Sequence, residues 1–187
     1  TLDYYHLSNT QLETIVLPEN LVNINWNTFE GCTELKNIVC GGKLKTMLNG
    51  AFNGCSKLKQ ITFPATVRFE YKDSRDGSIY YAPHQLYNVE FFKGCSELTD
   101  ITFLGDFYWT NEAIENFRFN DWSTLFEDTK LTNLTINGAS YNIPPYAFYN
   151  CKQMMLLDGS LAATKLKTLG NYSFYNCFSY APNPDVA

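Results

Sequence analysis

The sequence lacks the features that mark several classes of protein. Its 187 residues contain no Cys-x-x-Cys pair, only two histidines (His6 and His84) and no Gly-x-Ser-x-Gly segment. Zinc sites are built from clustered cysteine and histidine, and α/β-hydrolases carry their nucleophile in the missing serine segment, so neither class is indicated. Since no run of about 18 apolar residues occurs, we expect no transmembrane segment.

The charge of the chain also excludes a class of partner. The net charge is −5, only 18% of the residues are charged, and no basic cluster interrupts the sequence. Proteins that bind nucleic acid use clustered Lys and Arg against the phosphates, so we expect no nucleic-acid partner. With 45% hydrophobic residues the chain is able to form an ordered domain with a sizeable core.

Signals for catalysis or metal binding are weak. The segment CGGKLKT (40–46) does not have the spacing of a phosphate-binding loop, and DSRDG (73–77) lacks the ligand spacing and closing Glu of a calcium loop. The pairs Asp73/Asp76 and Glu112/Glu115 are the only candidates for glycosidase-type carboxylates, and surface loops carry such pairs routinely. We therefore expect no catalytic residues, no metal and no cofactor, and keep a glycan-acting hydrolase as a remote alternative.

One phrase recurs along the chain. It reads FEGCTEL (29–35), FNGCSKL (52–58), FKGCSEL (92–98), FYNCKQM (148–154) and FYNCFSY (174–180), with shorter versions at 8–12 and 126–131. From Leu12 the apolar positions follow in steps of 3, 2, 4, 3, 5 and 6, and the same steps start again at Leu35. The chain is thus an array of units of 23 residues, in which some units carry extra residues.

Each unit predicts one coil of a solenoid. The Leu-x-x-Ile-x-Leu/Phe segment has the period of a short strand, the following Leu-x-x-Ile segment predicts a second extended piece, and the glycine of each phrase predicts a corner. One coil cannot bury its apolar face alone, but stacked coils do. We expect about six parallel strands, starting near residues 12, 35, 58, 98, 131 and 154, and a sheet about 24 Å wide at about 4.8 Å per strand.

The phrase AFNGCSKLKQITFP (51–64), with the Leu-x-x-Ile-x-x-x-Ala-Phe pattern around it, resembles the BspA-type leucine-rich repeat, over roughly residues 8–68, 89–104 and 123–177. The resemblance implies a right-handed coil with a parallel β-sheet, mostly β and loop with little helix. It also implies a bacterial cell-surface or secreted location and a role in adhesion or protein binding. We expect a single domain over 1–187, in a monomer, with 178–187 as a C-terminal cap or linker.

The six cysteines are assigned to the scaffold. Five of them occupy one position of the repeat, and Cys40 occupies the inward position held elsewhere by Leu17 and Phe63. Stacked neighbours such as Cys32 and Cys55 are expected about 4.8 Å apart with parallel Cα–Cβ bonds, which is too far for a disulfide. We predict buried free thiols, with disulfides and a reactive or metal-binding role as the alternatives.

Two insertions are the first candidate binding site. They lie within residues 69–88 and 105–121, in consecutive coils, and are rich in Tyr, Phe and Trp. Loops added to a repeat often bind ligands, and aromatic rings offer large contact area. The candidate residues are Tyr80, Tyr81, Tyr108, Trp109 and, directly after the second insertion, Trp122. The alternative is that the two insertions pack on each other as a satellite core.

The outward face of the strands is the second candidate. Its chosen positions are Asn37, Gln60, Thr62, Asp100, Thr102, Asn133 and Thr135, which continue from Thr14, Val16 and Val39. The alternative is a solvated sheet face on which Thr is simply a good strand residue. Both candidates point to a non-catalytic module that binds a protein or a glycan. A structural spacer within a larger surface protein is the main alternative.

Overall fold

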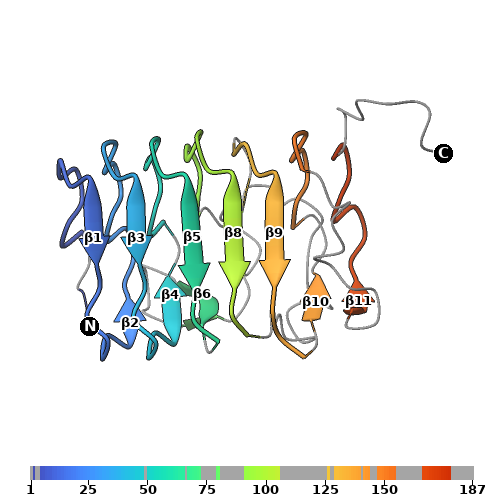
Figure 1. The fold of residues 1–187 in the computed structure, drawn as a ribbon, viewed down its shortest axis with the longest axis horizontal. Helices are drawn as coiled ribbons and strands as arrows, with labels where there is room; N and C mark the ends of the chain where they lie inside the picture. The colour runs from blue at the N-terminus through green and yellow to red at the C-terminus, as the bar shows by residue number, and fades with distance from the viewer. Residues whose placement is uncertain are drawn as a thin grey trace.

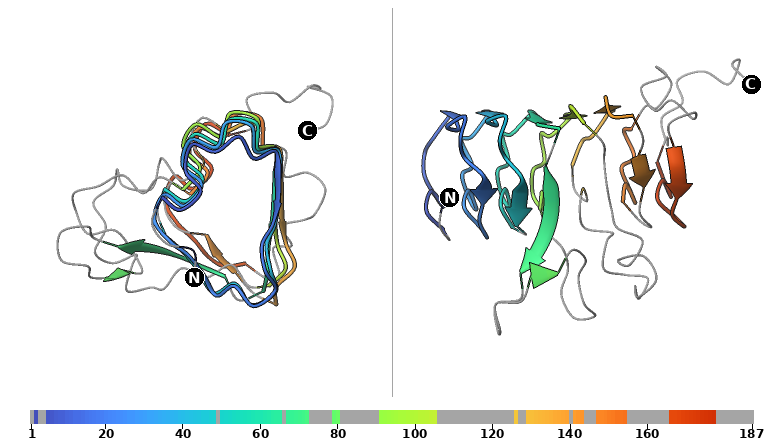
Figure 2. Two further views of the ribbon diagram at one scale, coloured as in Figure 1. Left: turned by 90° about the vertical axis from the view of Figure 1, so that its left-hand side faces the viewer. Right: turned by 90° about the horizontal axis from the view of Figure 1, so that it is seen from below.

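The computed structural model describes residues 2, 5–48, 50–65, 67–72, 79–80, 91–105, 126, 129–139, 141–143, 147–154 and 166–177. Over these residues the chain winds into coils stacked along one axis (Figure 1). Viewed along that axis, successive coils superimpose on one three-sided outline (Figure 2, left). Strands and turns occur among the described residues, and no helix does. The predicted solenoid is confirmed.

One side of the solenoid is a five-stranded parallel sheet in the order β1-β3-β5-β8-β9. Its strands are β1 (Thr14–Val16), β3 (Asn37–Val39), β5 (Gln60–Phe63), β8 (Asp100–Phe103) and β9 (Asn133–Ile136). Their central apolar residues pair in one register, from Ile15 through Ile38, Ile61 and Ile101 to Leu134. Since side chains alternate along a strand, this register puts every central residue on the inner face.

A second series of strands confirms the second extended piece of the units, except in the unit that starts at Leu98, where this piece lies outside the described residues. β2 (Asn23–Ile24), β4 (Thr46–Leu48), β6 (Arg68–Lys72) and β7 (Ile79–Tyr80) form a four-stranded sheet. β10 (Tyr141–Ile143) and β11 (Leu166–Leu169) form a parallel pair. β6 and β7 pair antiparallel inside the first insertion, so this insertion begins as a hairpin that projects from the coil (Figure 2, left).

A column of phenylalanines runs through the core from one coil to the next. Phe29, Phe52, Phe92, Phe126, Phe148 and Phe174 follow one another in the repeat, and successive ring centroids lie 5.1–5.8 Å apart with nearly parallel planes. All but Phe174 are fully buried. Burial of each ring stabilises the fold by about 1.5–3 kcal/mol, and offset stacking adds to it.

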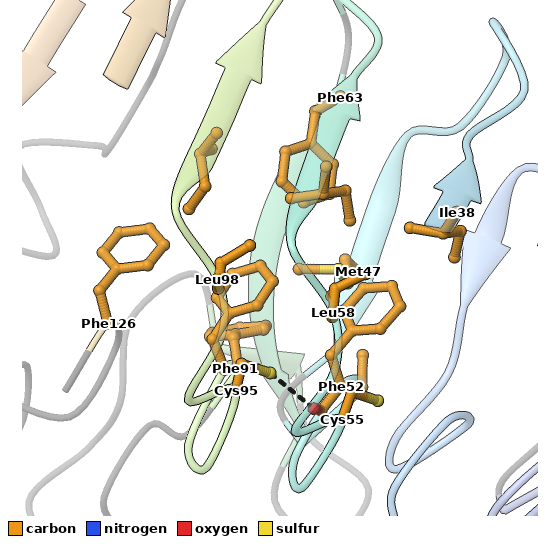
Figure 3. Packing of buried hydrophobic residues seen from close by; sticks show 14 of the residues in the cluster. Ile38, Met47, Phe52, Cys55, Leu58, Phe63, Phe91, Cys95, Leu98 and Phe126 are labelled. Carbon is orange, nitrogen blue, oxygen red and sulfur yellow. Dashed lines mark hydrogen bonds between the residues drawn. The ribbon is translucent and has the colours of Figure 1, made fainter. Parts of the chain in front are cut away.

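The cysteines are free thiols, as predicted, and each cysteine of the repeated phrase links its coil to the one before. The Sγ of Cys55 donates to the Phe29 carbonyl (3.1 Å) and the Sγ of Cys95 to the Phe52 carbonyl (3.1 Å; Figure 3). Cys32, Cys151 and Cys177 make the corresponding bond. Burial raises the pKa of Cys95 to about 12 and that of the half-buried Cys40 to about 12, so these thiols stay protonated and unreactive at neutral pH.

The corners require left-handed backbone conformations. Gly31, Gly54 and Gly94 have φ of 71°, 72° and 75°, as expected of the glycine in the repeated phrase. Asn9, Asn150 and Asn176 hold the same position in other coils, with φ of 54–61°. Glycine and asparagine are the residues that tolerate this conformation best, which explains why the third position of the phrase alternates between them.

Burial of the repeat positions is weaker in the outermost coils. Leu12 and Ile15 are half-buried, whereas Leu35 and Ile38 at the same positions of the next coil are buried. Leu169 differs from Ile24 and Met47, the buried residues at the same position of earlier coils. Leu169 pairs with Ile143 in register but is exposed, because it lies in the last coil that the structure describes.

Several sequence predictions fall outside the described residues. The sixth strand, expected to start near residue 154, would lie mainly in 155–165, and the second insertion, the segment 111–119 within it and the tail 178–187 are outside as well. Of the first insertion, the structure describes β6 and β7 alone. The division of the chain into a single domain over 1–187 therefore stays a prediction.

Candidate functional site

The outer face of the five-stranded sheet is the broadest regular surface in the described part of the chain. Two columns of side chains run across it, one residue from each strand. The first column is Thr14, Asn37, Gln60, Asp100 and Asn133, and the second is Val16, Val39, Thr62, Thr102 and Thr135. The five strands lie side by side in the stack (Figure 1). Because neighbouring strands of a sheet lie about 4.8 Å apart, each column presents a side chain at that spacing.

The strand-face residues chosen from the sequence all lie on these columns. Asn37, Gln60, Thr62 and Asn133 are exposed, while Asp100, Thr102 and Thr135 are half-buried. The structure thus brings all seven together on one face. Hydrogen bonds order part of it, since Asn133 Nδ2 donates to Asp100 Oδ1 (2.6 Å) and the Thr99 hydroxyl donates to Asp100 Oδ2 (2.5 Å).

Two valines on the second column were not chosen as site residues. Val16 is 70% exposed and Val39 is 54% exposed, and they pair in register on β1 and β3. Thr62 continues their column on β5. Exposed apolar side chains that adjoin one another, with polar residues around them, are typical of a contact surface for another macromolecule. The sequence did contain a signal for them, because Val16 and Val39 fall at the same outward position of successive repeats.

Charged residues border the polar column. The Lys36 ammonium donates to Glu13 Oε2 at 2.9 Å, and this hydrogen bond holds the pKa of the Glu13 carboxyl below its usual value. One coil further along, Lys57 binds both carboxylate oxygens of Glu34 at 2.7 and 2.8 Å, which raises the pKa of Lys57. Exposed pairs of this kind add little to stability, but they fix alternating charges beside the sheet face.

The aromatic candidates of the insertions are only partly reached by the structure. Tyr80 lies in β7, where its backbone pairs with that of Tyr71. Tyr81, Tyr108, Trp109 and Trp122 lie outside the described residues. Whether these rings form a binding patch or a satellite core stays a prediction.

The structure shows a different aromatic cluster, which the sequence analysis missed. Tyr149 and Tyr175 each follow a phenylalanine of the core column, and their rings stack with centroids 5.1 Å apart. Tyr172 meets Tyr175 edge-on at 5.8 Å. The available signal was the repetition of FYNC at 148–151 and 174–177, because equal positions of adjacent coils stack.

Groups suited to chemistry are sparse in the described residues. No three His, Cys, Asp or Glu side chains lie close enough there to hold a metal ion. The described part of the chain also has no helix long and apolar enough to cross a membrane. The feature that stands out among the described residues is the extended outer face of the sheet.

Comparison with known proteins gives a consistent result. The family model described as "BspA type Leucine rich repeat region" matches the chain in six copies, over residues 1–75 and 122–181. Among solved structures, the chain is similar to the crystal structure of a leucine-rich repeat protein from Bacteroides ovatus. The identity is 13%, 94% of this chain and 67% of that chain are covered, and the TM-score is 0.34. No curated protein matches the chain.

Proposed function

The chain belongs to the BspA-type leucine-rich repeat family, and we propose that it is a binding module of a bacterial cell-surface or secreted protein that holds a protein partner on the outer face of its parallel sheet. Repeat proteins of this kind are generally non-catalytic binding or structural modules. The observation that carries the proposal is the pair of exposed valines, Val16 and Val39, set in a column of otherwise polar residues.

The chemistry of this face favours a protein over a glycan. None of the ten residues of its two columns is aromatic, so the face has no ring on which a sugar would stack. It offers instead a small apolar centre at Val16 and Val39, amides at Asn37, Gln60 and Asn133, and an ordered border of charge. An apolar centre with a polar rim is the usual arrangement of a protein–protein contact.

The rigidity of the face supports the same proposal. Its strands are held on both sides by parallel neighbours, except at β1 and β9, and the side chains of its second column are short and β-branched. Valine and threonine have few rotamers to lose, so the entropy lost on binding is small.

The test is a binding screen against a panel of immobilised extracellular matrix proteins. The sheet-face variant Val39→Lys/Thr62→Lys places two bulky charges on the second column. The control Val22→Lys places the same side chain at an exposed valine outside the sheet. We expect the sheet-face variant to bind at least about tenfold more weakly than the wild-type chain, with an unchanged unfolding temperature, and the control to bind normally.

A second variant separates the alternatives. Tyr80→Ala, Tyr81→Ala, Tyr108→Ala and Trp109→Ala together remove four aromatic rings of the insertions. Binding lost only in this variant would move the proposed site to the insertions. No binding by any of the proteins would favour the structural spacer.

A further inference from the structure

Three tyrosines, Tyr149, Tyr172 and Tyr175, gather at the corner of the last described coils. Tyr172 and Tyr175 are 53% and 52% exposed, although both are large side chains. The position of Tyr149 and Tyr175 in the repeat is taken by Ser8, Glu30, Asn53 and Lys93 in the coils before. Because polar residues serve equally well at this position, the coil does not need an aromatic ring there.

The corner that carries Tyr172 has a left-handed backbone in several coils. Tyr172 has φ of 58°, and Tyr5, Asn27 and Gly50 hold this position in earlier coils with φ of 52°, 52° and 74°. The conformation is therefore a property of the corner. What distinguishes the last described coils is that Tyr172 meets a second tyrosine, Tyr175, which in turn stacks on Tyr149.

Two amides lie next to the rings. Asn150 and Asn176 directly follow Tyr149 and Tyr175, and Asn176 Nδ2 donates to Asn150 Oδ1 at 2.9 Å on the protein surface. This bond uses one donor of Asn176 and one acceptor of Asn150. Each amide has both donor and acceptor groups, so the pair keeps further hydrogen-bonding capacity beside the aromatic rings.

Few charged residues adjoin the cluster in the sequence. Residues 141–151 and 168–184 contain no Asp, Glu, Lys or Arg, in a chain that has 33 such residues in all (14 Lys+Arg and 19 Asp+Glu), and Lys152 and Lys167 border these segments. The segments themselves therefore supply no charged group to an ionic ligand. A neutral ligand with apolar C–H faces and many hydroxyls matches exposed tyrosine rings and amides.

We propose that Tyr149, Tyr172 and Tyr175, with Asn150 and Asn176, form a second binding site, and that it takes a neutral glycan. The apolar face of a pyranose ring stacks on the exposed rings of Tyr172 and Tyr175, while the two asparagine amides bond its hydroxyls. The site belongs to segments 147–154 and 166–177 (orange and red in Figure 1), which are not part of the five-stranded sheet. It does not depend on the protein partner proposed for that face.

The experiment is titration of the intact chain with neutral oligosaccharides, observed by saturation-transfer difference NMR. The probes are hexaoses of glucose, xylose, mannose and N-acetylglucosamine. We expect at least one of them to bind with Kd of about 0.1–1 mM, a range typical of a small and shallow contact. Binding of none of the four by the wild-type chain would overturn the proposal.

Three variants test the site, and a fourth is the control. Tyr175→Ala should weaken binding at least about tenfold, whereas Tyr175→Phe keeps the ring and should bind within about threefold of the wild type. Tyr172→Asn should lose binding while the protein becomes no less stable, because asparagine tolerates the left-handed conformation. Loss of binding with intact stability separates a contact with the ligand from a structural role.

Tyr5→Ala is the matched control at the other end of the stack. Tyr5 holds the same position of the repeat as Tyr172, with φ of 52°, and is equally exposed at 52%. We expect this variant to bind the oligosaccharide normally. Equal losses in Tyr5→Ala and Tyr175→Ala, or tighter binding of anionic oligosaccharides or peptides than of the neutral probes, would overturn the proposal. The sheet-face variant Val39→Lys/Thr62→Lys should bind the oligosaccharide unchanged, so failure of either proposal is recognised separately.

Discussion

At the scale of single residues, the corner of each coil depends on a backbone conformation rather than on a contact. Gly54 has φ of 72°, and a Cβ atom built on it would lie 3.5 Å from the nearest atoms of Gly31, an ordinary van der Waals distance. The space for a methyl group is therefore present. What a side chain would meet at this position is the unfavourable left-handed conformation itself.

Gly54→Ala is expected to lower the free energy of unfolding by about 1–2 kcal/mol, the cost of placing an alanine in the left-handed region. Gly54→Asn should cost clearly less, because Asn9, Asn150 and Asn176 already hold this position of the repeat. Urea unfolding followed by circular dichroism measures both values. Equal costs for the two variants would mean that steric crowding, and not the backbone conformation, fixes the glycine.

The buried thiols make stability depend on alkaline pH. Cys95 is fully buried, and burial raises its pKa from 9.0 to about 12. The unfolded chain therefore releases this proton at a lower pH than the folded one. The contribution of Cys95 to stability is fully present below pH 9 and is lost as the pH rises from 9 to about 12.

Within that window, Cys95 should lower the free energy of unfolding by about 1.4 kcal/mol for each unit of pH. The measurement is the difference in unfolding free energy between the wild type and Cys95→Ser at pH 8, 9 and 10. Serine does not titrate in this range, so the difference should shrink from pH 9 to pH 10 by clearly more than from pH 8 to pH 9. A difference that is constant up to pH 10 would contradict the raised pKa.

At the scale of the structural element, the repeated phrase builds the same corner each time, and the phenylalanine column shows how. Phe52 is fully buried between Phe29 and Phe92, and Phe174 at the end of the described column is half-buried with Phe148 on one side. The same residue type at the same position of the repeat is thus fully buried in one coil and half-buried in another. The contrast allows the effect of burial to be measured with one kind of mutation.

Phe52→Ala is expected to cost about 3–5 kcal/mol, the usual cost of a large cavity in a packed core. Phe174→Ala should cost less than half of that, because its ring is already partly in contact with water. Thermal and urea unfolding of the two variants give the comparison. Equal costs would show that the column does not end at Phe174 in solution.

The elements also show what a sequence of this kind does and does not predict. The steps between apolar residues predicted the strands β1, β3, β5, β8 and β9. The prediction succeeded because the same steps recur in successive units and each unit forms the same coil. Leu169 has an apolar position of the repeat but is exposed. The steps indicate where a residue lies within its coil, but they do not indicate whether a following coil packs against it. The aromatic cluster of Tyr149 and Tyr175 was missed because its position of the repeat holds polar residues in the earlier coils and becomes tyrosine only in the two FYNC copies.

The candidate sites were predicted unevenly for the same reason. The strand-face columns follow from register, so Asn37, Gln60 and Asp100 were placed on one face before the structure was known. The insertion aromatics have no repeat to position them, and the sequence offers no periodicity that relates Tyr81 to Trp109. A repeat predicts what recurs, and these loops do not recur.

At the scale of the whole molecule, the described strands make their contacts with the neighbouring strands of the stack. Backbone hydrogen bonds join neighbouring coils of the stack. The backbone N–H groups of Leu17, Thr99 and Leu104 donate to the carbonyls of Val39, Lys59 and Phe63, respectively. Stability in such an array is a sum over coils and over the interfaces between them. A destabilising mutation should therefore affect mainly its own coil and the coils next to it.

Ile15 and Ile61 hold the same position in an outer and a central coil. Ile15 is half-buried on β1, which has β3 as its sole neighbour in the sheet, whereas Ile61 is buried on β5 between β3 and β8. Ile15→Ala should accelerate amide hydrogen exchange in residues 5–17 and leave 91–105 unchanged. Ile61→Ala should cost about 2–5 kcal/mol and accelerate exchange in 50–65 and in 91–105, because it weakens the interfaces on both sides of its coil.

Both effects are measured by hydrogen exchange followed by mass spectrometry, with all variants at the same pH and temperature. Val22→Ala, at an exposed site outside the five-stranded sheet, is the control. The argument depends on the nearest-neighbour character of the fold. If the stack opened as one unit, Ile15→Ala would accelerate exchange in 91–105 as much as in 5–17, in proportion to its total loss of stability. A gradient of protection from the central coils toward the outer ones would instead place the most rigid surface at β3, β5 and β8, the strands that carry Val39, Thr62 and Asp100.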